Sequence, residues 1–152
     1  MLAHHGAQPD TLTDVDHVQA RELLSGARIA RLGTIAPDGR PAVVPICFVL
    51  TGDVIYHAID DKPKATRRLA RLANLAADPR ATVLADHYEE DWSALWWVRA
   101  DGRARVLSDT SVPEAARALD LLAQRYRQYR ARRPAGPVIA LDVERITGWA
   151  AT

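Results

Sequence analysis

Cationic and hydroxyl side chains gather in one short run of this chain, Lys62-Pro63-Lys64-Ala65-Thr66-Arg67. The apolar run at 54–58 before it predicts a strand, and leucines and alanines spaced three and four apart at 69–76 predict a helix after it. These groups therefore meet at a helix N-terminus, where unpaired N–H groups and the helix dipole favour an anion. Lysines at this position oppose the dipole unless an anion is bound. The pattern predicts a phosphate site, and hence a phosphorylated cofactor or substrate.

Bulk composition narrows the class of protein. The 152 residues include 20 basic and 19 acidic side chains, a net charge of +1, which gives no reason to expect nucleic acid or an anionic membrane as a partner. Cys47 is the only cysteine, so no intrachain disulfide can form and a reducing compartment is favoured. No signal peptide or bilayer-spanning run is recognisable. We expect a cytoplasmic protein.

The predicted helices frame a single domain at 13–152 that follows a flexible leader at 1–12. The first helix covers 14–25, with Thr13 as N-cap and Gly26 as its stop. The second covers 65–77 and ends at Asp78-Pro79. The third begins at 111–114, where Ser-Val-Pro-Glu matches a capping box, and continues past Tyr129 to the prolines at 134 and 137.

The predicted strands fill the intervals between these helices. Their ranges are 29–35, 42–50, 54–58, 81–85, 95–107 and 138–146. The turn at 37–40 joins the first two as a hairpin, and Gly102 marks a bulge or bend in the fifth. Tight hairpins indicate an antiparallel sheet, and strands this short are expected to close into a small barrel. The fold class is therefore mainly β (α+β), a six-stranded antiparallel barrel with flanking helices.

The order of these motifs resembles a known family. A strand, Lys-Pro-Lys-x-Thr, a helix, Asp-Pro-Arg-Ala and the Trp-containing stretch at 91–102 are similar to the pyridoxamine 5′-phosphate oxidase-like split β-barrels. Within them the chain most resembles actinobacterial proteins that use the deazaflavin coenzyme F420. The resemblance implies a six-stranded split barrel that forms a homodimer with two cofactor sites at the subunit interface.

The resemblance also implies the cofactor-binding residues. Lys62, Lys64 and Thr66 would hold the phosphate, and the backbone of Val44, Pro45 and Ile46 would lie along the ring. The remaining residues are His57 and Ala58 on the ribityl side and Trp97 from the partner subunit. Flavin-binding oxidases place an arginine where this chain has Pro63, so phosphate binding would depend on Lys62 and Arg67. This departure favours the deazaflavin over FMN.

The function expected from these residues is hydride transfer between the reduced deazaflavin and a small organic substrate. The alternatives are an FMN-dependent oxidoreductase of the same fold, and a non-enzymatic carrier of flavin, deazaflavin, haem or tetrapyrrole. No catalytic side chain is identified; solvent or His57 is the proton source considered.

Several residues have a second interpretation. Arg67, Arg68 and Arg71 form either a solvated helix face or a basic track for the coenzyme's acidic tail. Adjacent Trp96 and Trp97 must face opposite sides of their strand, so one can enter the core while the other meets an interface or the cofactor.

The acidic loop at 86–91 matches no metal-binding spacing. Six arginines at 117–133 lack the aromatic interleaving of a nucleic-acid module.

Overall fold

The fold was analysed in a computed structural model that describes residues 12–60 and 65–151, of which 12, 13 and 65–69 are described by their backbone only. Four α-helices are present in these ranges: α1 (His17–Gly26), α2 (Ala65–Ala77), α3 (Pro113–Arg125) and α4 (Arg127–Ala131). The first two strands are β1 (Leu12–Asp14) and β2 (Ala30–Ile35). The others are β3 (Pro41–Ile46), β4 (Val49–Thr51), β5 (Val54–Ala58), β6 (Arg80–His87), β7 (Trp96–Leu107) and β8 (Val138–Ala151). No described helix is long and apolar enough to cross a membrane.

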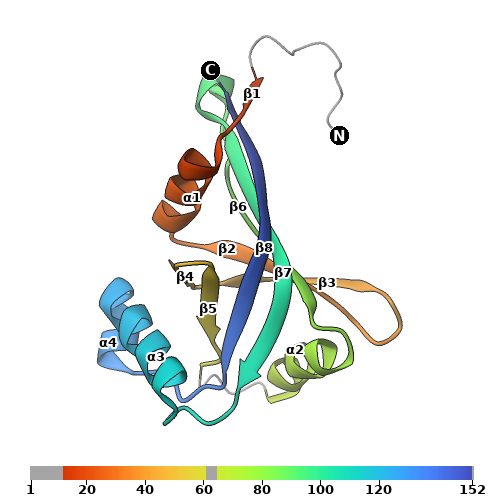
Figure 1. The fold of residues 1–152 in the computed structure, drawn as a ribbon, viewed down its shortest axis with the longest axis vertical. Coiled ribbons are helices and arrows are strands. Elements are labelled where there is room, and N and C mark those ends of the chain that lie inside the picture. The colour runs from red at the N-terminus through yellow and green to blue at the C-terminus, as the bar shows by residue number, and fades with distance from the viewer. Residues whose placement is uncertain (1–11, 61–64, 152) are drawn as a thin grey trace.

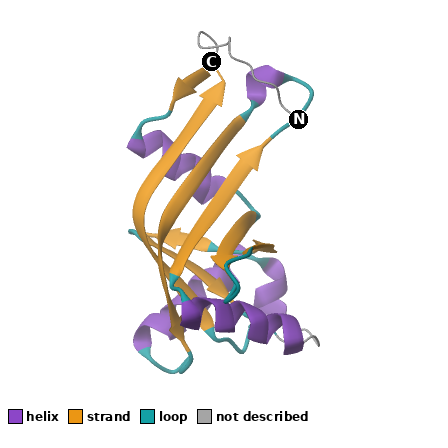
Figure 2. Cartoon of the chain, turned by 90° about the vertical axis from the view of Figure 1, so that its right-hand side faces the viewer, coloured by secondary structure: helices purple, strands orange, loops and turns teal. Residues whose placement is uncertain are grey.

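The strands form one antiparallel sheet in the order β3-β2-β6-β7-β8-β5-β4, with β1 added beside the end of β8. Figure 1 shows β7 and β8 side by side along the length of the molecule, with α1 on one flank of the upper half and α2 and α3 at the lower end. The turned view in Figure 2 shows the same long strands as one twisted layer. The mainly antiparallel split barrel predicted from the sequence is confirmed.

The sheet is not closed, which corrects the expected small barrel. Its pairing path ends at β3 and at β4, because the predicted strand 42–50 breaks at Cys47 and Phe48. The chain turns there, and β4 pairs with β5 at the other end of the path. The Tyr126 hydroxyl fixes this break by bonding the N–H and the carbonyl of Phe48, each at 3.0 Å. Six strands have five or more residues, and β1 and β4 add two three-residue strands.

Two hydrophobic clusters hold the sheet. The larger fills the concave side of β2, β6, β7 and β8, where Leu32, Val83 and Val98 are fully buried. The smaller joins β5 and β8 to α3 through residues such as Leu122 and Val138. Trp96 packs against the larger cluster, while Trp97 pairs with Trp149 in the register of β7 and β8. The predicted division of the two tryptophans between opposite faces is therefore correct.

The predicted bulge at Gly102 is also present. The register between β7 and β8 shifts between Asp101 and Gly102. A Cβ built on Gly102 would lie 2.0 Å from the carbonyl oxygen of Asp142, a distance that no side chain can occupy. Glycine is therefore required for the two backbones to approach this closely.

Three helix ends differ from the sequence prediction. Asp16, not Thr13, caps α1 by accepting a 2.8 Å hydrogen bond from the Gln19 N–H. The Ser111 hydroxyl donates to Asp109 instead of capping α3, whose N-cap is Val112 with Pro113 in the first turn. The third predicted helix is divided at Tyr126, whose extended backbone separates α3 from α4.

Candidate cofactor site

The residues predicted to bind a cofactor, other than Trp97, fall into three groups. Val44, Pro45 and Ile46 end β3, and His57 and Ala58 end β5. Thr66 and Arg67 lie in the first turn of α2, where only the backbone is described, and Lys62 and Lys64 lie outside the described residues. Their predicted phosphate contacts stay predictions. The ends of β3 and β5 do meet, because His57 Nδ1 donates to the carbonyl of Cys47 at 3.1 Å.

Trp97 does not join this group within one chain. It is the second residue of β7, opposite Asp86 on one side and Trp149 on the other. Its ring meets the Trp149 ring edge-on at 6.4 Å, and the Arg99 guanidinium lies 5.8 Å from its centroid. Because its neighbours Trp96 and Val98 belong to the core side, Trp97 lies on the opposite face of the sheet, which we call the convex face.

The edge of β3 directed away from β2 is open to a ligand; we call it the open edge of β3. Within the described residues no strand pairs with it. Paired residues of β2 and β3 alternate between hydrogen-bonded and non-bonded positions. The N–H of Ala36 donates to the carbonyl of Arg40 at 2.9 Å, so Ala36 and Arg40 are a hydrogen-bonded pair. The next pair along the two strands, Ile35 with Pro41, is therefore a non-bonded one. Even-numbered residues of β3 therefore bond β2, and odd-numbered ones direct their backbone to the open edge.

The odd-numbered residues are Pro41, Val43 and Pro45, and all three are exposed. Proline has no N–H, which agrees with their placement on the side away from β2. The open edge therefore carries three carbonyl acceptors and a single donor, the N–H of Val43. Val44 and Ile46 have their backbone groups in the ladder with β2, so of the three predicted ring contacts only Pro45 presents its backbone to this edge.

His57 is buried and both of its ring nitrogens are engaged. A carbonyl can only accept, so Nδ1 carries the proton that bonds Cys47. A guanidinium can only donate, so Nε2 accepts from Arg71 Nη1 at 2.5 Å. Burial, followed by the charge of Arg71, lowers the pKa of His57 to about 3. The ring is neutral at physiological pH and its lone pair is occupied, so His57 is unsuited to be the proton source considered from the sequence.

Arg71 was not among the predicted phosphate ligands, yet it lies one turn after Arg67 on α2 and its described side chain reaches His57. It extends from the second turn of α2 to the end of β5, half-buried, and burial lowers its pKa. Its Nε is buried without a hydrogen-bond partner among the described residues. A buried donor without a partner is costly, and a bound anion would relieve that cost. Arg71 therefore does not belong to a solvated basic track.

A sequence signal for Arg71 existed. It directly precedes Leu72 and stands four residues before Leu75, both of which turn toward the core. An arginine at the border of an apolar helix face must direct its guanidinium inward or along the protein surface. Tyr129 from α4 and Asp60 after β5 act electrostatically on this guanidinium, and burial raises the pKa of Tyr129.

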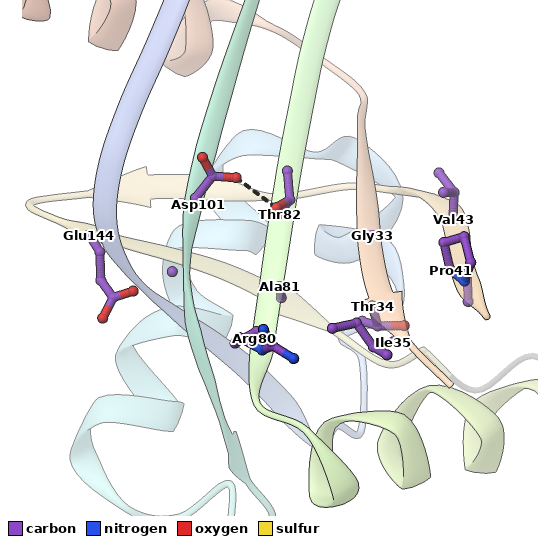
Figure 3. A pocket seen from close by; sticks show the side chains of 12 residues that line it. Gly33, Thr34, Ile35, Pro41, Val43, Arg80, Ala81, Thr82, Asp101 and Glu144 are labelled. Carbon is purple, nitrogen blue, oxygen red and sulfur yellow. Dashed lines mark hydrogen bonds between the residues drawn. The ribbon is translucent and has the colours of Figure 1, made fainter. Parts of the chain in front are cut away.

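A hollow of about 390 Å³ lies on the convex face, over β2, β6 and β7, and extends from β3 on one side to β8 on the other (Figure 3). Gly33 forms part of its floor: a Cβ there would meet only backbone oxygens, at 3.8 and 4.0 Å, so a side chain would fit and occupy the space. Burial alone would raise the pKa of Asp101, but hydrogen bonds from Thr82 (2.7 Å) and Arg145 (3.2 Å) hold it below its ordinary value. The hollow thus has an apolar side, with Pro41 and Val43, and a polar side on which the Asp101 carboxylate is paired with arginines.

The residues present fit a phosphorylated redox cofactor with a flat ring. The unpartnered Nε of Arg71 suits an anionic headgroup, and the open edge of β3 offers an exposed backbone against which a ring can lie. These two features are joined by the His57 bond to Cys47, one residue beyond β3. Fold and contacts thus define a split β-barrel in which the ends of β3 and β5 meet and Arg71 of α2 reaches His57.

Comparison with known proteins identifies the family. Residues 17–150 match the family model described as pyridoxamine 5′-phosphate oxidase, and the chain belongs to that family. A search of curated proteins gives no match.

Solved structures share the fold at low sequence identity. A FAD-binding protein from Mesorhizobium loti is 21% identical, covering 93% of this chain and 99% of its own, with a TM-score of 0.70. The FAD binding protein from Mycobacterium smegmatis is 19% identical over 90% of this chain and 97% of its own, with a TM-score of 0.60. The heme storage protein HutZ from Vibrio cholerae is 16% identical over 86% and 92%, with a TM-score of 0.67.

Proposed function

We propose that this protein is an oxidoreductase that binds the deazaflavin coenzyme F420 and transfers a hydride between it and a small organic substrate. The observation that carries the proposal is the half-buried guanidinium of Arg71, oriented by a neutral His57 and left with an unpartnered donor next to the end of β3. Membership of the pyridoxamine 5′-phosphate oxidase family supports a cofactor of this kind. When bound, the cofactor supplies the hydride chemistry.

The protein's own contribution is binding and orientation. Arg71 would neutralise the headgroup, with Lys62, Lys64, Thr66 and Arg67 as the predicted further ligands. Charge-assisted hydrogen bonds from a guanidinium contribute about 1.5–3 kcal/mol each. The open edge of β3 would hold the ring in one plane. With His57 neutral and occupied, solvent is the proton source in this proposal.

We further propose that two copies of the chain enclose the cofactor between their convex sheet faces. This face carries the aromatic rings of Tyr88, Trp97 and Trp149, and the Trp149 ring meets each of the other two edge-on. It also carries the arginines 31, 99 and 145, paired with Asp86 and Asp101. Aromatic residues and arginine are the types enriched at protein interfaces. Trp97 would then reach the cofactor held mainly by the partner.

Two other functions are compatible with the same site. FMN could replace the deazaflavin in an enzyme of the same class, as the similarity to FAD-binding proteins suggests. The similarity to a heme storage protein keeps a non-enzymatic carrier as the second candidate. An enzyme requires open space beside the reactive edge of the ring for a substrate, whereas a carrier does not.

The decisive experiment is purification from a host that makes both cofactors, followed by the absorption spectrum and mass of the bound compound. Bound deazaflavin, followed by oxidation of the reduced coenzyme with a panel of carbonyl and conjugated acceptors, would support the enzyme. Bound FMN would support the flavin alternative. Stoichiometric haem, or bound coenzyme without turnover, would support the carrier.

A further inference from the structure

The open edge of β3 is unusually poor in hydrogen-bond donors. Of the three residues that direct their backbone outward, Pro41 and Pro45 have no N–H, so Val43 is the single donor among three carbonyl acceptors. The outward direction of these backbone groups follows from the register of β2 with β3 and from the Ala36–Arg40 hydrogen bond, which shows which residue pairs of the two strands are hydrogen-bonded. All three residues are exposed, and Val43 retains 65% of its accessible surface. A molecule that lies on this edge can therefore reach these backbone groups directly.

The two cofactor candidates differ at one ring position that such an edge can sense. Position 5 of an oxidised flavin is a nitrogen with a lone pair, which accepts a hydrogen bond. In a 5-deazaflavin the same position is a C–H group, which does not. An acceptor removed from water without a donor costs about 1–3 kcal/mol, and carbonyl oxygens nearby add repulsion to that cost.

We propose that Pro45 is a specificity residue: by removing the N–H that the open edge of β3 would otherwise offer, it disfavours a flavin and selects a 5-deazaflavin. The inference rests on the proposed function, in which the ring lies along the end of β3. Val43, whose N–H is intact, serves a ring carbonyl in either cofactor. Pro45 would change the relative affinity for the two cofactors. This selection does not require a side chain that touches the reacting atoms.

Edge protection is the competing explanation for the prolines. Proline on an edge strand prevents another chain from pairing with it. Under that explanation, replacing Pro45 would promote self-association and would leave the relative affinity for two ring systems unchanged. The two explanations therefore predict different results for the same variant.

The test compares two ligands that share ribityl and phosphate groups and differ only at position 5, oxidised FMN and oxidised 5-deaza-FMN. Dissociation constants are measured by calorimetric titration of the full chain. The wild type is expected to bind 5-deaza-FMN at least about tenfold more tightly. Pro45→Ala, which restores the N–H, is expected to reduce that preference about fivefold to tenfold, since one hydrogen bond contributes about 1 kcal/mol. Pro41→Ala, at the other end of the strand, is the matched control and should retain the wild-type ratio.

If Pro45→Ala loses solubility, a second variant, Pro45→Lys, takes its place. It also restores the N–H, and its positive charge opposes pairing of this strand edge with another chain. Its added charge acts equally on two ligands with the same phosphate, so the ratio stays interpretable. A wild-type ratio near one, or a ratio unchanged in both Pro45 variants, would overturn the inference and leave the proposed function standing. Failure of the wild type to bind either ligand would overturn both.

Discussion

Arg71 and His57 show how one hydrogen bond decides the chemistry available to two residues. With Nε2 accepting from the guanidinium and Nδ1 donating to Cys47, the imidazole orients a cation and is removed from proton transfer. The sequence predicted His57 as a cofactor-binding residue but could not assign its protonation state, because that state depends on Arg71, 14 residues away on α2. Residue types at the site can be predicted from the sequence nearby. The hydrogen-bond partner that sets the protonation state of His57 cannot, because it lies on a distant segment.

The first prediction at this scale concerns the headgroup. Arg71→Met keeps the apolar stem and removes the charge, so binding of FMN should weaken roughly tenfold to a hundredfold, as expected for loss of charge-assisted hydrogen bonds. Binding of riboflavin, which lacks the phosphate, should change little. Titration of both ligands measures the difference. Arg133→Met, an exposed arginine paired with Asp120, is the control, and an equal loss for FMN and riboflavin would exclude a phosphate contact.

The second prediction concerns the pH dependence of stability. The pKa of His57 is about 3 in the folded protein and about 6.5 in an unfolded chain. Between these values the unfolded chain binds the additional proton, so this contribution is complete above about pH 6.5 and is lost as the pH falls toward 3. The loss is about 1.4 kcal/mol per pH unit.

Urea denaturation at pH 5.0 to 7.5 measures this dependence. His57→Gln, which has no titrating group, should show a smaller loss of stability on acidification than the wild type does. His17→Gln, at an exposed position of α1, should keep the wild-type slope. Parallel slopes for the wild type and His57→Gln would contradict a buried neutral imidazole.

At the scale of elements, the sequence predicted best where one local rule sufficed. The bounds of α2 match the predicted helix 65–77 because alanine- and leucine-rich periodicity ends there at Asp78-Pro79. The break at Cys47 and Phe48 was missed because the run 42–50 is uniformly apolar and its one turn-type residue, Pro45, lies within β3 and not at the break. Its cause is the Tyr126 hydroxyl, 78 residues away. β8 extends to Ala151 because its partner β7 begins at Trp96, which no pattern within β8 reveals.

The bulge between β7 and β8 gives the prediction at this scale. Gly102→Ala should destabilise the protein by about 2–3 kcal/mol or more, because the new Cβ would collide with the Asp142 carbonyl and force the two strands apart. Chemical denaturation measures the change in the free energy of unfolding. Gly26→Ala is the matched control, since a Cβ at Gly26 has no neighbour within 4 Å. A loss below about 0.5 kcal/mol for Gly102→Ala would show that the bulge is not constrained as described.

For the whole molecule, the two faces of the sheet have different roles. The concave face is filled by the core, whereas the convex face leaves Val43 exposed and Trp97 and Trp149 only half-buried. Partly exposed aromatic side chains and an exposed valine on the face that the core does not fill are of the types that a partner surface uses. The proposed homodimer would cover them and would also complete the cofactor site, so association and cofactor binding should depend on the same residues.

Two valines make this dependence measurable, because Val43 on β3 and Val18 on α1 are each 65% exposed. A carboxylate at either position costs a single chain little, since neither side chain is buried. In a dimer joined through the convex face, Val43→Asp would place a charge in the interface at each of two symmetric sites. Sedimentation velocity should therefore show Val43→Asp as a monomer and Val18→Asp as a dimer, with weakened cofactor binding in the first variant only. A dimeric Val43→Asp would place the interface elsewhere, and a monomeric wild type would exclude a site shared between two copies.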